Sequence, residues 1–417
     1  MRVSAQLVRA ADGYQIWSQS YDHKLDDIFA IQDGIAADVV KQLKVKLLGA
    51  APKARVTDPR AYALYLQARQ LGRQFTADAF KSSDALYRQA LAIDPRYVQA
   101  WDGLARNFSN ETIAGVLPNA QGLRQAREVA GRALAIDPDY APAQAMLGYL
   151  SMVQSDLPAA ARYLERALAL DPTDLGVLNN SAALLKSLGR LPPAIAIEEY
   201  VVARDPVDPS PLQNLGISYL YAGRYDAAIA KFHTLLSLSP SFAGAHYTIG
   251  EALLLKGDAV GGLAQMQQEK SEMWRMIGLP LAYCALKRKA DADTAFAALI
   301  AQYTKDAPFN IAYDYAYCGE ADPAFAWLDQ AVAYQDPGLS GIVTENLFDK
   351  IRHDPRWLPF LRKIGYAPEQ LAKIQFTVTL PDAAGAGSDA ASAAVETSTT
   401  APAAAPAQAG TASTGQP

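Results

Sequence analysis

A small group of potential metal ligands lies near the start of the chain, where His23 is accompanied by Asp22, Asp26 and Asp27. Imidazole and carboxylate groups at this spacing could hold a divalent cation. The same aspartates stand directly before an amphipathic run, where an aspartate side chain accepts hydrogen bonds from the free N–H groups of a first helical turn. Helix capping explains the group without a metal, and we expect no metal site here.

Other side-chain chemistry is sparse. His233, His246 and His353 have no cysteine, serine or carboxylate at a catalytic or metal-binding spacing, so we expect structural roles for them. The sequence has no dinucleotide-binding glycine motif, no phosphate-binding loop and no nucleophile elbow. Cys284 and Cys318 are too few for a disulfide framework or a structural zinc site, and we expect two small core residues. The sequence therefore predicts a non-enzymatic protein without a cofactor.

Composition narrows the classes of partner. The chain has 38 Lys and Arg against 43 Asp and Glu, a net charge of −5, and no basic stripe that could neutralise phosphates. We therefore expect no direct contact with nucleic acid. No run of 18 apolar residues and no signal-peptide core is present, which predicts no membrane span. As written, the chain is expected in the cytoplasm, or in the periplasm if an upstream membrane segment belongs to the intact protein.

The strongest pattern is a period of 34 residues. Proline follows an apolar run and an acidic residue or serine at regular steps of 34, at Pro138, Pro172, Pro206 and Pro240. Small residues recur at two further positions of each period, where two packed helices must approach closely: Gly148, Ala182, Gly216 and Gly250, and then Ala160, Ala194, Ala228 and Gly262. A third position holds Gly189, Gly223 and Gly257, and it predicts helix ends that need a positive φ.

A helix–turn–helix of 34 residues with this pattern resembles the tetratricopeptide repeat (TPR). The resemblance extends from about residue 60 to 335 and implies about eight hairpins in an all-α, right-handed superhelical solenoid. One copy carries nine extra residues near Ser109 to Gln121, which we expect to form a long turn inside its hairpin. Later copies are less regular, although Gly319, Ala324, Leu328 and Ala331 keep the pattern of a second helix.

The first 50 residues follow a different pattern. Two apolar-containing runs, Val3 to Arg9 and Tyr14 to Tyr21, flank an Asp-Gly turn signal, and an amphipathic stripe follows from Ile28 to Leu47. A lone hairpin with one helix is too small to be stable. The segment is similar to the end of a TolB-N-terminal-like module, which implies that residues 1–50 are the remnant of a truncated α/β domain.

We therefore predict three regions: the α/β remnant at 1–50, the TPR array with a closing segment at 58–375, and a tail at 376–417. The tail consists mainly of Ala, Ser, Thr, Gly and Pro from residue 381 onward. It has too little apolar surface to repay ordering, and we expect disorder.

The TPR resemblance also implies a binding face, the concave groove lined by fixed positions of each first helix. Carried over to this sequence, these positions are Tyr149, Met152, Asn179, Lys186, Gln213, Tyr221, Tyr247 and Glu251. Aromatic and Met side chains with scattered polar groups suit a peptide or helix ligand, with Tyr149, Tyr221 and Tyr247 as exposed anchors. Alternatively, this tyrosine-rich face packs against the array's own turns or tail.

Two hypotheses of function follow. The first is a protein–protein interaction scaffold that binds another protein or a peptide segment in the concave groove, with self-association left open. The alternative is the sensory or regulatory half of a bacterial signalling protein, separated from an effector such as a nucleotide cyclase or a winged-helix transcription regulator. A TPR-linked glycosyltransferase is the third reading, and we expect no catalytic domain for it beyond residue 375.

Overall fold

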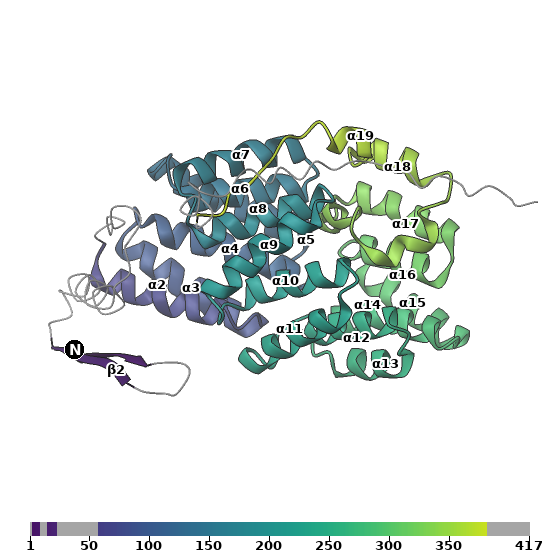
Figure 1. The fold of residues 1–417 in the computed structure, drawn as a ribbon, viewed down its shortest axis with the longest axis horizontal. Helices are drawn as coiled ribbons and strands as arrows, with labels where there is room; N and C mark the ends of the chain where they lie inside the picture. The colour runs from purple at the N-terminus through teal and green to yellow at the C-terminus, as the bar shows by residue number, and fades with distance from the viewer. Residues whose placement is uncertain (1, 9–14, 23–56, 382–417) are drawn as a thin grey trace, which may run out of the picture. The chain divides into compact units, whose positions relative to one another are not determined.

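Eight consecutive helical hairpins form a solenoid in this computed structural model, which describes residues 2–8, 15–22 and 57–381. Figure 1 shows the hairpins stacked in chain order, and the expected all-α TPR-like solenoid is confirmed. The paired helices are α2 (Pro59–Gly72) with α3 (Ala77–Ile93), α4 (Val98–Ile113) with α5 (Asn119–Ile136), α6 (Ala141–Val153) with α7 (Leu157–Leu170), α8 (Leu175–Ser187) with α9 (Leu191–Arg204), α10 (Pro209–Tyr221) with α11 (Tyr225–Leu238), α12 (Ala245–Leu255) with α13 (Ala259–Gln268), α14 (Glu272–Ala285) with α15 (Lys289–Tyr303), and α16 (Pro308–Cys318) with α17 (Ala321–Ala333).

The ends of these helices follow the sequence punctuation. Asp156, Asp174 and Asp208 precede α7, α8 and α10, and each side chain accepts a hydrogen bond from a backbone N–H of the first turn. The turns inside three hairpins contain Gly189, Gly223 and Gly257 at φ of 72°, 71° and 91°. The predicted positive φ at these glycines is confirmed, because a side chain there would be strained.

Small residues let the two helices of a hairpin touch. A Cβ atom added at Gly148 would lie 2.8 Å from Leu164, and one at Gly216 would lie 2.6 Å from Phe232. Both partners are fully buried, so neither could move aside without disturbing the core. The 34-residue spacing therefore reports the register of helix packing.

The nine-residue insertion differs from our expectation. Residues 109–113 continue α4 and residues 119–121 begin α5, so only residues 114–118 form the turn between them. The extra residues mostly lengthen both helices, because the sequence keeps a helical pattern through them, and the predicted long turn is wrong. The longer hairpin reaches a distant repeat, where the Asn119 side-chain amide donates to the main-chain oxygen of Asp306 at 3.3 Å.

The first hairpin also contacts a repeat far along the chain. The rings of Phe75 and Phe242 stack with their centroids 4.3 Å apart. Arg73 forms ion pairs with Asp205 at 2.9 Å and Asp208 at 3.1 Å. Hairpins distant in sequence are thus held to one another by apolar and charged contacts.

The two cysteines correct another expectation. Cys284 on α14 and Cys318 on α16 form a disulfide, with Cα atoms 5.5 Å apart and positions 34 apart in sequence. They occupy the same position in adjacent copies of the repeat, which brings equivalent residues of two first helices together. The reading of two separate core cysteines is therefore wrong.

After α17 the chain turns back across the earlier repeats. This closing segment contains η2 (Pro337–Gly341), η3 (Asn346–Ile351), α18 (Trp357–Ile364) and α19 (Pro368–Leu371). In Figure 1 the yellow stretch after α19 runs over the earlier helices. Arg190 donates to the main-chain oxygens of Ile374 and Phe376, and Phe376 is buried. Residues 382–417, most of the predicted disordered tail, lie outside the described residues.

At the N-terminus β1 (Arg2–Val8) and β2 (Gln15–Asp22) pair antiparallel, with Arg2 opposite Asp22 and Leu7 opposite Trp17. The predicted hairpin is therefore present. The predicted helix along Ile28 to Leu47 and the Asp26–Asp27 cap lie outside the described residues, and the TolB-like origin of this region stays a prediction.

Candidate functional site

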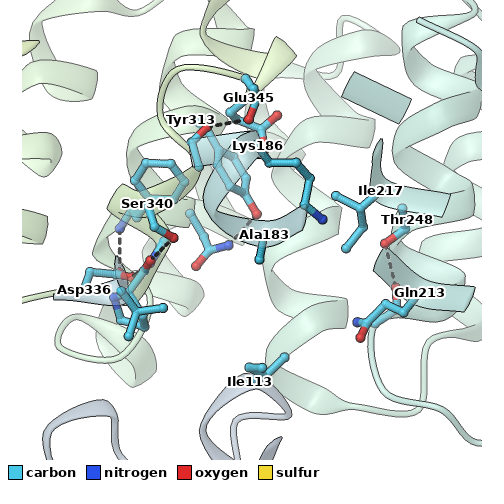
Figure 2. A pocket seen from close by; sticks show the side chains of 18 of the residues that line it. Ile113, Ala183, Lys186, Gln213, Ile217, Thr248, Tyr313, Asp336, Ser340 and Glu345 are labelled. Carbon is cyan, nitrogen blue, oxygen red and sulfur yellow. Dashed lines mark hydrogen bonds between the residues drawn. The ribbon is translucent and has the colours of Figure 1, made fainter. Parts of the chain in front are cut away.

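A cavity of about 310 Å³ lies on the inner face of the repeats. First helices of several hairpins, the first residue of α5 and the closing segment all contribute side chains to it. In the view of Figure 2, Asp336 and Ser340 lie at the left of the open space, Gln213, Ile217 and Thr248 at the right, and Ile113 below. We call this space the inner cavity; its lining includes Tyr149, Met152, Ala183, Lys186, Gln213, Ile217, Tyr221, Tyr247, Glu251, Trp274, Asp306, Tyr313, Asp336 and Glu345.

Seven of the eight groove residues expected from the sequence line this cavity: Tyr149, Met152, Lys186, Gln213, Tyr221, Tyr247 and Glu251. The eighth, Asn179, lies on α8 outside the lining, and its side-chain oxygen accepts a hydrogen bond from the Asn214 amide at 3.0 Å. The repeat register thus brings together residues that are up to 102 positions apart in the chain.

The tyrosines are more enclosed than we expected. Tyr247 is 4% exposed, so the expectation of an exposed anchor is wrong for this residue, and Tyr149 and Tyr221 are half-buried. The Tyr247 and Tyr313 hydroxyls lie 2.9 Å apart and share a hydrogen bond. Burial raises the pKa of all four tyrosines of the cavity, Tyr149, Tyr221, Tyr247 and Tyr313, so they stay neutral at physiological pH.

The closing segment provides part of the enclosure. The Tyr221 hydroxyl donates to Glu345 at 3.2 Å, and the Asn346 amide donates to the main-chain oxygen of Leu220 at 3.0 Å. The tyrosine-rich face therefore packs in part against the protein's own chain, although the contacts are with the closing segment and not with the turns or tail that the alternative named. The cavity is lined by both the closing segment and the first helices, so the contacts between them leave space for a ligand.

Carboxyl groups are the main polar feature of the site. Glu251 on α12 and Glu345 before η3 are each 4% exposed and line the cavity, and Asp314 on α16 is fully buried close to them. Burial, followed by repulsion from Glu345, holds the pKa of Glu251 well above its usual range. Burial raises the pKa of Glu345 to about 7 and that of Asp336 to about 6.

These carboxyl groups have no cationic partner among the described residues. No Lys, Arg or His nitrogen of residues 57–381 lies within ion-pair distance of the Glu251, Asp314 or Glu345 carboxyl oxygens. Oε1 of Glu251 and both side-chain oxygens of Asp314 also lack a hydrogen-bond donor there. Lys186 lines the cavity, but its Nζ lies 2.9 Å from Glu198 Oε1 and forms an ion pair with that buried group.

Sequence reasoning missed Tyr313, Asp314, Asp336 and Glu345. The first two lie on α16, in a copy too irregular to assign a groove register, and the others lie in the closing segment, which has no repeat period. One available signal was an aspartate inside the apolar run of Phe309 to Cys318, because a buried charge in such a run is unusual.

A second hollow, of about 320 Å³, lies among the earlier repeats, and we call it the polar groove. Its lining includes Tyr65, Arg69, Arg73, Tyr87, Asp102, Arg106, Tyr140, Asp174, Asp205 and Asp208. Arg106 pairs with Asp102 at 3.2 Å, and Arg73 pairs with two aspartates. Arginine and aspartate side chains here largely satisfy one another.

The remaining candidates contribute little. His246 hydrogen-bonds to Gln265 at 2.8 Å, and no group of three or more metal-ligating side chains occurs among the described residues. In the same part of the chain, no helix is long and apolar enough to cross a membrane. The His23 group lies outside the described residues except for the backbone of Asp22.

Comparison with known proteins supports the repeat assignment. Residues 119–175 and 214–270 match the family model described as tetratricopeptide repeat. The chain therefore contains TPR repeats, a fold that commonly serves as a protein-interaction scaffold. Neither match includes the N-terminal segment 1–50.

One curated relative is a putative adenylate cyclase 3 of Rhizobium meliloti strain 1021, which is 33% identical over 109 residues. This match covers 25% of the present chain and only 19% of the relative. Among solved structures, the Pseudomonas aeruginosa pilF protein gives a TM-score of 0.37 at 19% identity, covering 50% of this chain and 92% of its own. A TPR protein of Parabacteroides merdae gives 0.41 at 16% identity, covering 59% and 98%. We draw no functional conclusion from these two structures.

Proposed function

We propose that this chain is a non-enzymatic interaction module whose inner cavity receives a short segment of a partner polypeptide. The observation that supports the proposal most is the convergence of seven predicted groove residues on one cavity. Aromatic walls with a few polar groups are typical of sites that anchor a ligand side chain.

The size of the cavity favours a side chain over a whole helix. Its volume of about 310 Å³ stands at the small end of the range for small-molecule sites. Half-buried Lys186, Gln213 and Ile217 line it together with buried Tyr247. A partner segment would therefore insert one or two side chains while its backbone lies across the closing segment and the neighbouring first helices.

The test is to fill the cavity and select ligands. Ala183→Trp places an indole ring in the cavity, and Val260→Trp is the matched control because Val260 is 72% exposed and does not line it. A random peptide library displayed on phage is selected on wild-type protein, and binding of the recovered peptides is then measured for each variant. We expect binding to survive in Val260→Trp and to be lost in Ala183→Trp at an unchanged melting temperature. Peptides that bind both variants equally would contradict the proposal.

A second candidate function is the regulatory part of a signalling protein. The supporting observation is the 33% identity with the putative adenylate cyclase over 109 residues. Reading the genomic DNA in frame upstream of Met1 tests it. A frame that continues into a cyclase or winged-helix domain would support this function, and an in-frame stop codon directly upstream would count against it.

A further inference from the structure

The described residues that line the inner cavity include more acidic than basic ones. Four acidic residues line it, Glu251, Asp306, Asp336 and Glu345, and Asp314 lies fully buried near Glu251 and Glu345. Lys186 is the one basic residue in the lining, and Glu198 is already its partner. Arg352 donates to the main-chain oxygen of Glu345 at 2.8 Å, so its hydrogen bond does not go to the carboxyl group.

Glu251 points to a ligand in particular. The residue is 4% exposed, it lines the cavity, and its Oε1 atom has no hydrogen-bond donor among the described residues. Leaving a buried polar atom unsatisfied costs about 1–3 kcal/mol, and native proteins rarely retain such groups without a reason. A donor that enters the cavity from outside would satisfy this oxygen.

Aromatic rings surround the same space. Tyr221, Tyr247, Tyr313 and Trp274 all line the cavity, and the Tyr247 and Trp274 rings lie 5.0 Å apart between centroids. The face of an aromatic ring carries partial negative charge and attracts organic cations, most strongly where water is excluded. Rings and carboxyl groups therefore favour the same kind of ligand.

We propose that the inner cavity binds a primary alkylammonium group, held by Glu251 and Glu345, with the aliphatic chain against Tyr221, Tyr247 and Trp274. The proposal rests on the proposed function, and it identifies the inserted group as a lysine side chain of the partner segment. A free polyamine offers the same chemistry, and the experiment below separates the two sources.

An ammonium ion suits this site better than the other cations. No set of ligands for a metal ion occurs in the described residues. An ammonium group is a compact charge with three donors on a flexible chain, and it can bond two carboxyl groups from different directions. A guanidinium group is planar and needs a wider opening for its five donors.

Binding of a cation at this site should depend on pH, because it is linked to the protonation of the two carboxyl groups. Burial raises the pKa of Glu345 to about 7 and that of Glu251 well above its usual range, whereas a bound cation stabilises the charged forms of both. Binding should therefore release protons and become tighter as the pH rises from 6 to 8, a range in which the ligand amine stays charged. The other titratable and charged groups that face these two are Asp314, Asp349, Tyr221, Tyr247, Tyr313 and the Arg352 guanidinium.

The experiment is isothermal titration calorimetry on the full chain. The probes are N-acetyl-lysine amide, N-acetyl-norleucine amide as its uncharged counterpart, and spermidine. The variants are Glu251→Gln and Glu345→Gln, with Glu165→Gln as the control because Glu165 is exposed on α7 and does not line the inner cavity. Melting curves of all variants confirm folding.

We expect the lysine probe to bind wild type and Glu165→Gln at least tenfold more tightly than the norleucine probe. Each cavity variant should lose at least tenfold in affinity for the lysine probe. Spermidine that binds at least tenfold more tightly than the lysine probe would overturn a lysine side chain as the source. If neither amine binds, or if both cavity variants bind like wild type, the cation site is refuted. The function proposed above would still stand if phage-selected peptides bind the cavity without a lysine requirement.

Discussion

The polar groove and the inner cavity are alike in volume, at about 320 and 310 Å³, but they differ in how their charges are satisfied. In the polar groove, Arg73 and Arg106 have aspartate partners within 3.2 Å. In the inner cavity, the Glu251 and Glu345 carboxyl groups have no cation within ion-pair distance among the described residues. Volume alone would not separate the two hollows. Charge balance distinguishes the first, a network of paired side chains, from the second, where we propose a binding site.

Removing one member of a buried pair should have the largest effect. Lys186→Met leaves fully buried Glu198 without its cation, and we expect a loss of about 3–5 kcal/mol in unfolding free energy. Chemical denaturation with urea measures the loss. The double variant Lys186→Met with Glu198→Leu should recover most of it, because two apolar groups replace the pair. If Lys186→Met were as stable as wild type, the Lys186–Glu198 pair would not be a buried charge pair that depends on both of its members.

The disulfide should contribute nearly as much. It joins α14 to α16, the helix of Tyr313 and Asp314, across 34 residues of chain. Chain-entropy arguments give a stabilisation of about 3–4 kcal/mol for a loop of this length. We expect Cys318→Ser to lower the melting temperature, and wild type under reducing agent to match it. Equal melting curves for oxidised and reduced wild type would contradict this account of how the cavity wall is held.

An intermediate effect is expected in the polar groove. Arg73→Met removes the cation shared by Asp205 and Asp208, at side chains that are 21–28% exposed. We expect a loss of about 1–3 kcal/mol, less than for Lys186 because water screens part of the interaction. Arg60→Met is the control, since the Arg60 side chain is 72% exposed and its pair with Asp58 should contribute little to stability. If both variants lose the same stability, burial is not what distinguishes these pairs.

The smallest expected change in unfolding free energy is a gain, whereas the variants above lose stability. Glu251→Gln removes a buried carboxyl group that has no cationic partner among residues 57–381, so we expect no loss of stability at pH 5 and a gain of up to about 1 kcal/mol at pH 8. A carboxyl group whose pKa is raised on folding stabilises the protein fully below its unfolded pKa. This contribution is lost as the pH rises through the folded pKa. Unfolding free energies at the two pH values measure it, and a destabilised variant at pH 8 would indicate a partner for Glu251.

The repeat period explains how much the sequence could predict. Equal proline spacing fixes the register of α6 to α13, so the small packing residues and seven cavity residues follow from counting positions. Residues cannot be assigned by repeat position where the 34-residue period ends. Glu345 reaches the cavity only because the closing segment folds back, and the disulfide depends on adjacent first helices meeting in the irregular copies. The greater length of α4 and α5 was missed because the proline spacing gives only the total length of a repeat. The lengths of its helices depend on the local sequence pattern.

The charge state of the cavity carboxyl groups tests the central claim most directly. The side-chain carboxyl carbons of ¹³C-labelled glutamate can be followed by NMR as the pH is raised, with Glu251 and Glu345 assigned from their Gln variants. We expect Glu345 to titrate with a pKa of about 7 and the pKa of Glu251 to lie well above its usual range, because both are buried and form no ion pair with a cation of residues 57–381. Addition of N-acetyl-lysine amide should lower both pKa values. Ordinary glutamate pKa values in the free protein would contradict the account, since they would mean that these charges are already solvated or paired.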